Sequence, residues 1–326
     1  MKRATTISDI ARECGVSRWT VSAILCPSKN NRHSGYSEDT RELVLAAAKR
    51  LRYRPQRHTR CLRSSRHGVL GIMTANSYLV SWEMLHAMLR EARSANQLLS
   101  IETFVPGDAN LPLFIRENVV DGLILFETLP AVFEEAIAYH QIPAVYVNAC
   151  RHGSNAINMD EAGAISSLVT RFAQAGRTRV GLIGQYGEVT FDRERQVALR
   201  RVCTELRLPA PRVCVIEDLA TIEQSLTELF AQTPHCDALI VPSDYVASKV
   251  YKISARLGRR IPQDLAVVSM LNNMRLLDYE PPVNACELPE SILGKLAVQM
   301  LSRIIAGEGP LEEVLLPYEF MQRQSG

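Results

Sequence analysis

The first 55 residues place apolar side chains at the spacing of short α-helices. In the first helix Thr6 stands where it can cap the start and Asp9 follows three residues later, which predicts a capping box. Gly15 then ends this helix, and Ser17 can cap the next one. Two short helices joined by a glycine turn predict a helix-turn-helix, whose second helix lies in a DNA major groove.

The periodicity divides the second helix into an inward and an outward face. The inward face is apolar and consists of Val21, Ile24 and Leu25. The outward face carries Arg18, Trp19, Ser22 and Ala23. Arg18 can bond O6 and N7 of a guanine, and Trp19 can cover thymine methyl groups, although a tryptophan here can instead belong to the core. The hydroxyls suited to hold phosphates, or simply to cap the helix, are those of Ser17, Thr20 and Ser22.

A third helix and a polar segment complete this region. Ser37 can cap the helix. Its predicted apolar stripe is Leu43, Val44, Ala47 and Leu51. After Pro55, the segment 56–65 is rich in arginine and has one lone leucine, Leu62. Such a segment is either a flexible linker or a piece of chain that orders on a partner.

From Gly68 onward, short apolar runs alternate with amphipathic ones. The predicted strands are 69–74, 98–104, 122–126, 144–148, 156–159, 180–184, 213–216, 238–241 and 266–270. Helices are predicted over 82–95, burying Trp82, Leu85, Leu89 and Ala92, over 162–175, burying Ile165, Leu168, Val169 and Phe172, and over 289–306. Nearly continuous apolar strands between helices predict parallel, doubly wound α/β sheets, and about 260 residues predict two lobes.

Ligands of open α/β sheets bind beyond the carboxyl ends of the strands. The polar residues expected at those ends are Asn76, Tyr78, Asn148, Asp160, Gln185 and Asp244.

Charge is distributed unevenly along the chain. Residues 1–67 contain 15 Lys and Arg against five Asp and Glu, whereas the remainder contains 22 against 30. The net charges are therefore +10 and −8, which indicates a polyanionic partner for the first part alone.

Composition narrows the class of protein further. The eight cysteines are scattered without a Cys-x-x-Cys pair, so a zinc site or a disulfide framework is not expected, and neither is a cofactor. There is no apolar run long enough to span a bilayer and no secretory leader, so we expect a cytoplasmic protein without a membrane partner.

Together these motifs resemble the lactose-repressor (LacI/GalR) family of bacterial transcription regulators, over essentially the whole chain. The matching positions near the start are Thr6-Ile7-x-Asp9-Ile10-Ala11, Gly15-Val16-Ser17, Thr20-Val21-Ser22 and Tyr53-x-Pro55. The later ones are Asp160-Glu161-Ala162-Gly163, Arg195, Ser243-Asp244, Gly258 with Ile261-Pro262-x-Asp264-Leu265, and Leu316-Pro317-x-Glu319.

The resemblance implies a domain layout and a function. A helix-turn-helix domain spans 1–55, a hinge helix 56–66 and an effector-binding and dimerisation domain 67–326. In the last, lobe one comprises about 67–160 plus 289–318, and lobe two about 161–288. A homodimer would bind a pseudo-palindromic operator as a repressor, and a small molecule between the lobes, a sugar or another metabolite, would change that affinity. The sequence ends without a heptad tail that would predict a tetramer.

Residue roles follow from the same positions. The implied DNA contacts are Thr6, Ser17, Arg18, Trp19, Thr20, Ser22 and Tyr53, with Arg57, Thr59, Arg60 and Leu62 in the hinge helix, where Leu62 would wedge between base steps. The implied effector contacts are Asn76, Tyr78, Asn148, Asp160, Arg195, Asp244 and Asn272. Taken alone, Leu62 is an ordinary linker residue, Asp244 a helix cap and Arg195 a surface charge.

Some positions depart from the family pattern, and two other classes of protein are alternative interpretations of the sequence. Ala23 stands where many relatives carry arginine, and Thr59 where alanine is usual. The segments 77–82 and 269–272 differ from the usual cleft motifs, which argues against a typical sugar effector. One alternative is a cytoplasmic α/β enzyme or small-molecule-binding protein with a non-specific DNA-binding head. Its sign is Gly181-x-x-Gly184-x-x-Gly187, whose spacing is wrong for a dinucleotide motif. A transporter's solute-binding protein would share the two lobes but needs export.

Overall fold

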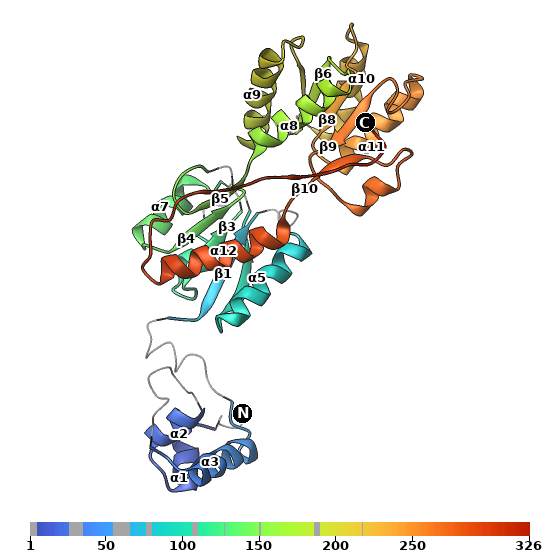
Figure 1. Cartoon of the computed structure of the whole chain (residues 1–326). Helices are drawn as coiled ribbons and strands as arrows, with labels where there is room; N and C mark the ends of the chain where they lie inside the picture. Colours follow the sequence, from blue (N-terminus) through green and yellow to red (C-terminus); the bar gives the residue numbers. More distant parts are fainter. Residues whose placement is uncertain are drawn as a thin grey trace. The chain divides into compact units, whose positions relative to one another are not determined.

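The structure is a computed structural model that describes residues 5–25, 35–54, 66–75, 80–105, 110–126, 128–149, 151–185, 190–216 and 218–326. The chain forms two compact units, Met1–His67 and Gly68–Gly326 (Figure 1). Each unit has its own hydrophobic core.

The smaller unit, called the headpiece below, contains three helices. They are α1 (Ile7–Cys14), α2 (Arg18–Leu25) and α3 (Glu38–Arg50). The predicted capping box is present, because the backbone N–H of Asp9 donates to Thr6 Oγ1 at 3.3 Å and that of Thr6 donates to Asp9 Oδ2 at 2.9 Å. Gly15 ends α1 at φ +66°, a left-handed conformation that costs glycine little. The predicted helix-turn-helix is confirmed.

One side chain from each helix closes the headpiece core. Ile10, Val21 and Val44 are all fully buried. The prediction for α3 was wrong at Leu43, which is 50% exposed, while Ala47 is buried as expected. The core is therefore small, so truncating one of these side chains should destabilise the headpiece strongly.

The larger unit contains two six-stranded sheets, as the predicted fold class requires. Sheet one has the order β11-β5-β4-β3-β1-β2, and all of its pairs are parallel. Its strands are β1 (Val69–Thr74), β2 (Leu98–Thr103), β3 (Gly122–Leu125), β4 (Ala144–Val147), β5 (Ala156–Met159) and β11 (Val314–Leu316). Its helices are α5 (Trp82–Ser94), α6 (Leu113–Arg116), α7 (Ala131–Tyr139) and α12 (Glu290–Ile305).

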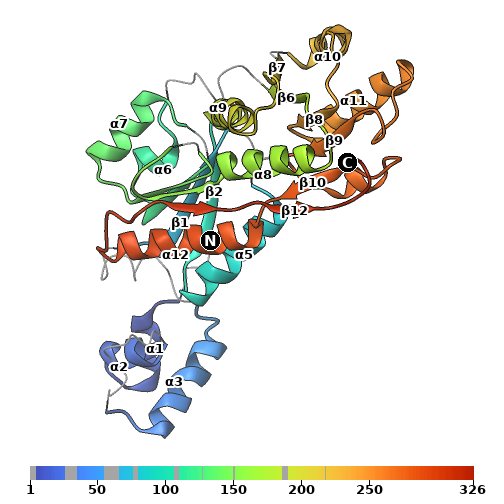
Figure 2. The same cartoon turned by 45° about the horizontal axis from the view of Figure 1, so that its top comes forward.

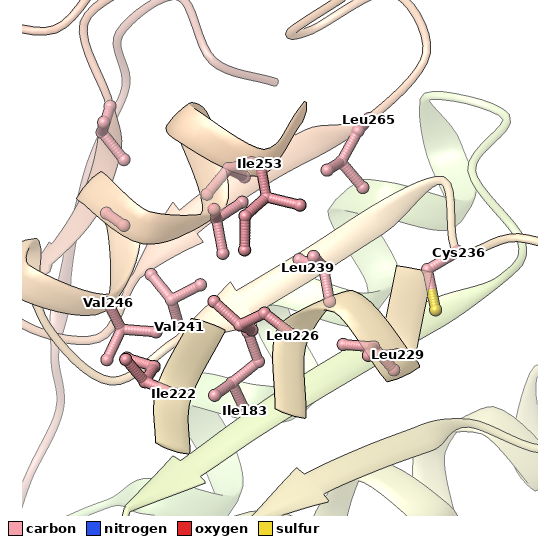
Figure 3. Packing of buried hydrophobic residues seen from close by; sticks show 14 of the residues in the cluster. Ile183, Ile222, Leu226, Leu229, Cys236, Leu239, Val241, Val246, Ile253 and Leu265 are labelled. Carbon is pink, nitrogen blue, oxygen red and sulfur yellow. The ribbon is translucent and has the colours of Figure 1, made fainter. Parts of the chain in front are cut away.

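Sheet two has the order β12-β10-β9-β8-β6-β7 and is parallel except for the β10–β12 pair. Its strands are β6 (Val180–Gln185), β7 (Arg212–Ile216), β8 (Ala238–Val241), β9 (Ala266–Ser269), β10 (Asn284–Glu287) and β12 (Glu319–Met321). Its helices are α8 (Glu161–Gln174), α9 (Thr190–Glu205), α10 (Ile222–Ala231) and α11 (Asp244–Arg256), with 3₁₀ turns at Leu219–Thr221 and Met274–Leu277. Figure 3 shows part of its core, in which Leu239 of β8 faces Leu226 of α10 and Ile253 of α11.

The chain passes between the two sheets three times: from β5 to α8, from β10 to α12, and from β11 to β12. Figures 1 and 2 show the last of these as a long extended segment that runs from one sheet to the other. Tyr318, within this segment, packs against the cores of both sheets.

Helix α5 matches the predicted buried face only in part: Ala92 is buried and Leu85 packs against the core as predicted, but the other two residues do not. Trp82 and Leu89 are 74% and 43% exposed, whereas Met84, Ala87 and Met88 are buried. Both stripes have helical spacing, and contact with α12 selects between them (Figure 2). At the crossing, a Cβ added to Gly294 would lie 2.4 Å from the carbonyl oxygen of Met84, so the two backbones approach closely only over a face of small residues. Helix α8, by contrast, buries all four predicted residues.

Candidate functional site

The amino-terminal end of α2 presents two side chains outward. Arg18 is exposed and Trp19 is 59% exposed, so the interpretation of Trp19 as a core residue was wrong. Ser17 holds the start of the helix, because its Oγ accepts the backbone N–H of Thr20 at 3.0 Å and lies 2.8 Å from Thr20 Oγ1. The first turn of α2 therefore carries a cation, an aromatic ring and hydroxyls, a set of groups suited to DNA bases and phosphates.

The second turn of α2 is buried, contrary to the prediction from the sequence. Ser22 and Ala23 were assigned to the outward face, but they are only 7% and 1% exposed. The helix has two turns and packs against both α1 and α3, so four consecutive residues, 21–24, are buried. The Ser22 hydroxyl is therefore not presented to a phosphate by this surface, and position 23 is not presented to a base.

The remaining headpiece candidates have structural partners. Thr6 Oγ1 donates to Asp9 Oδ2 at 2.7 Å and so belongs to the capping box. Tyr53 packs against the headpiece core. Pro55 and the proposed hinge contacts lie outside the described residues; these contacts are Arg57, Thr59, Arg60 and Leu62.

Arg195, an expected effector contact, is buried in a network of charged groups rather than lying at the surface. Its Nε donates to Glu161 Oε2 at 2.7 Å, and its Nη1 lies 3.4 Å from Asp192 Oδ1. Glu161 also accepts the hydroxyl of Tyr318 at 2.6 Å. Arg195, Glu161 and Asp192 are each no more than 5% exposed. Burial opposes the charge of the guanidinium, but attraction to Glu161 outweighs it and raises the pKa of Arg195.

This network links the expected effector site to the segment that joins the sheets. Glu161 begins α8, Asp192 and Arg195 lie on α9, and Tyr318 lies between β11 and β12. Burial, and then the neighbouring Glu161 carboxylate, hold the pKa of Tyr318 well above its usual value, so its hydroxyl stays a donor. Sequence reasoning missed the partners of Arg195. The available signal was Asp192, three residues earlier on the same helix, where an acidic side chain meets a basic one.

Three of the other expected effector contacts, Asp160, Asp244 and Asn272, have partners within the protein. Asp160 caps α8 by accepting the backbone N–H of Gly163 at 2.8 Å. Asp244 is the first residue of α11 and pairs with Arg275 at 3.6 Å rather than capping the helix. Asn148 adopts a positive φ of 48° directly after β4. The side-chain amide of Asn272 donates a hydrogen bond to Glu287 through Nδ2, and its Oδ1 accepts one from Arg323 Nη2 at 2.5 Å. Asn76 and Tyr78 lie outside the described residues.

A cavity of about 640 Å³ opens at the other end of sheet two, where β6 and β8 begin. It is lined by Arg177, Arg179 and Asp237, among others. Arg177 donates to the carbonyls of residues 262 and 263, and Arg179 pairs with Asp237. These interactions hold together the loops at the amino-terminal ends of the strands. Ligands of such sheets bind at the opposite, carboxyl ends, so we do not assign the ligand site to this cavity.

Two observations limit other classes of site. Among the described residues, no helix is both long and apolar enough to cross a bilayer. Within the same residues, no group of three His, Cys, Asp or Glu side chains is arranged to hold a metal ion.

Comparison with known proteins gives consistent matches. Residues 6–56 match the model of bacterial regulatory proteins of the lacI family, and residues 169–326 match the periplasmic binding protein-like domain. The chain is 28% identical to the transcriptional regulator MalR of Streptomyces coelicolor, covering 98% of this chain and 96% of the relative. It is 25% identical to the transcriptional regulator TreR of Escherichia coli, covering 97% and 99%.

Solved structures show the same fold. The Lac repressor dimer bound to operator and the anti-inducer ONPF superposes with a TM-score of 0.82 at 20% identity, covering 99% of each chain. The complex of the regulator CelR with cellobiose gives a TM-score of 0.69 at 19% identity, covering 99% of this chain and all of the other.

Proposed function

Because the chain belongs to the LacI family of bacterial regulatory proteins, we propose that it is a cytoplasmic repressor of transcription that binds a specific operator. The first turn of α2 is the observation that carries this function. It presents Arg18 and Trp19 on the surface of a headpiece with a net charge of +10, which is what a recognition helix needs. Catalysis plays no part in this function.

The protein acts as a homodimer on a pseudo-palindromic site. Two headpieces related by a two-fold axis would read two half-sites in opposite orientation. Residues at the start of α2 contact base edges, while Ser17 and Thr20 hold phosphates. Because Ser22 and Ala23 are buried, base reading depends on the first turn of α2.

A small-molecule effector, a sugar or another metabolite, binds between the lobes and changes operator affinity. Asn148, Asp160, Arg195, Asp244 and Asn272 remain the proposed contacts, together with Asn76 and Tyr78. Glu161 and Asp192 occupy two of the five N–H groups of Arg195, so a ligand has to bond the remaining N–H groups or replace one of the two carboxylates. Ser269, which departs from the family pattern, is fully buried and donates to the carbonyl of Leu271, so it supports a loop rather than offering its hydroxyl to a ligand.

Selection of bound sequences from random duplex DNA tests this function. We expect the full chain to enrich one pseudo-palindromic sequence, with affinity that falls about 10³- to 10⁵-fold between about 50 and 200 mM salt if six to ten phosphates are neutralised. A second selection with the Trp19→Ala variant should show weaker preference within the half-sites but the same spacing between them. Equal recovery of all sequences by the wild type would refute sequence-specific recognition.

A further inference from the structure

His152 lies between two carboxylates that belong to different parts of the larger unit. Its Nδ1 is 2.8 Å from Glu313 Oε1, and its Nε2 is 2.8 Å from Glu194 Oε1. A neutral imidazole has one N–H and can donate to one carboxylate, whereas the imidazolium ion donates to both. The observed geometry is therefore that of protonated histidine.

One side of this bridge is fixed to sheet one. His152 follows β4, and Glu313 directly precedes β11. Glu313 also accepts the backbone N–H of Gly153 at 3.1 Å and Asn158 Nδ2 at 2.8 Å. Burial would raise the pKa of Glu313, but these hydrogen bonds and the one with His152 outweigh it and lower the pKa, so Glu313 is a carboxylate at neutral pH.

The other side belongs to sheet two. Glu194 lies on α9, which packs against α8 and buries Leu199 in the core on that side. Within the described part of the chain, His152–Glu194 is the one ion pair between a segment of sheet one and a helix of sheet two. The bridge thus joins the two lobes through groups that are not part of the proposed effector site.

Among the described residues, His152 is the only cation that forms an ion pair with Glu313 or Glu194. Arg151 is paired with Glu134 at 2.8 Å and lies over the ring of Tyr146. On α9, Arg195 points into its own buried network, and Arg193 is exposed. Hydrogen bonds with Glu194 and then with Glu313 raise the pKa of His152 above its usual value, although burial works slightly against them.

We propose that His152 is a proton-dependent clasp between the lobes, closed when the imidazolium bridges Glu313 and Glu194 and open when one proton leaves. When the ring is neutral, one of the two carboxylates loses its donor and both negative charges remain. The stabilisation is complete below the unfolded-state pKa of about 6.5 and disappears as the pH rises through the raised folded-state pKa. This regulatory role rests on the proposed function, in which the arrangement of the lobes sets operator affinity.

The clasp itself is tested without DNA. In the full-length protein we expect the NMR titration of His152, assigned with His152→Gln, to give a pKa above about 6.5 that falls in Glu194→Gln. The wild type should also melt higher than Glu194→Gln at about pH 5.5, with the difference vanishing near pH 9. His140→Gln, at an exposed histidine of the same lobe, should leave the melting profile unchanged. A His152 pKa that is normal, or unaffected by Glu194→Gln, would overturn the proposal.

The regulatory role is tested with the selected operator. Because the bridge is largely exposed, we expect the ratio of wild-type to Glu194→Gln affinity to change only about two- to fivefold between about pH 5.5 and pH 8.5. Parallel pH profiles for the two proteins would show that the clasp does not reach the DNA-binding unit and would overturn that role. Failure to find any operator would count against the proposed function alone, because the NMR and melting results do not depend on it.

Discussion

Replacing Arg195 by methionine should lower the free energy of unfolding of the larger unit by about 3–5 kcal/mol. The guanidinium is 5% exposed and is the cation between Glu161 and Asp192, both of which are also buried. Methionine fills a similar volume but removes the positive charge that both buried carboxylates contact. Urea unfolding of the full chain, followed through the far-UV signal of this unit, measures the loss.

Two further variants test whether the loss of stability comes from the buried carboxylates. Arg200→Met, at an exposed arginine on the same helix, should change stability by less than about 0.5 kcal/mol. Adding Glu161→Gln to Arg195→Met should restore part of the loss, since it removes one of the two buried negative charges that Arg195 balanced. If Arg195→Met were as stable as the wild type, Arg195 would not hold this network together and would be only a ligand contact.

Replacing Ile10 by alanine should unfold much of the headpiece while leaving the larger unit folded. Ile10 is fully buried with Val21 and Val44, and Ile→Ala in a core costs about 2–5 kcal/mol. A single core of this size rarely supplies more than about 3–5 kcal/mol, so the loss is comparable to the whole stability of the unit. We expect rapid proteolysis within residues 1–67, with a nearly unchanged melting temperature for the rest.

The matched control is Leu43→Ala on α3, because Leu43 is 50% exposed. It should leave both the protease resistance of the headpiece and operator binding close to wild type. Equal resistance of Ile10→Ala and Leu43→Ala would contradict the described core.

Local signals in the sequence predicted much of the fold correctly. Thr6, Asp9 and Gly15 predicted both ends of α1, because caps depend on side chains within a few residues of the backbone groups they satisfy. All nine predicted strands are present, with ends that differ by one residue at most. Their apolar runs are nearly continuous because helices cover the sheets.

Features set by tertiary contacts were not predictable in the same way. The strands β10, β11 and β12 are only three or four residues long, which is too short for a clear strand pattern. In β10 and β12 the residues Asn284, Glu287 and Glu319 also interrupt the apolar run. The buried face of α5 depends on Gly294 in a distant helix. The same holds for the candidate sites: Trp19 was correctly placed outward, but the burial of Ser22 and of Arg195 depends on helices that pack against them.

The most direct test of the whole account is the binding of the Arg18→Ala variant to the selected operator and to non-specific DNA. We predict that it loses about 1–3 kcal/mol at the operator and accepts other base pairs at the position that Arg18 contacts. The salt dependence of binding should change little, because the proposed contact of Arg18 is with a base rather than with a phosphate. An unchanged affinity together with an unchanged base preference would contradict the claim that the first turn of α2 reads DNA.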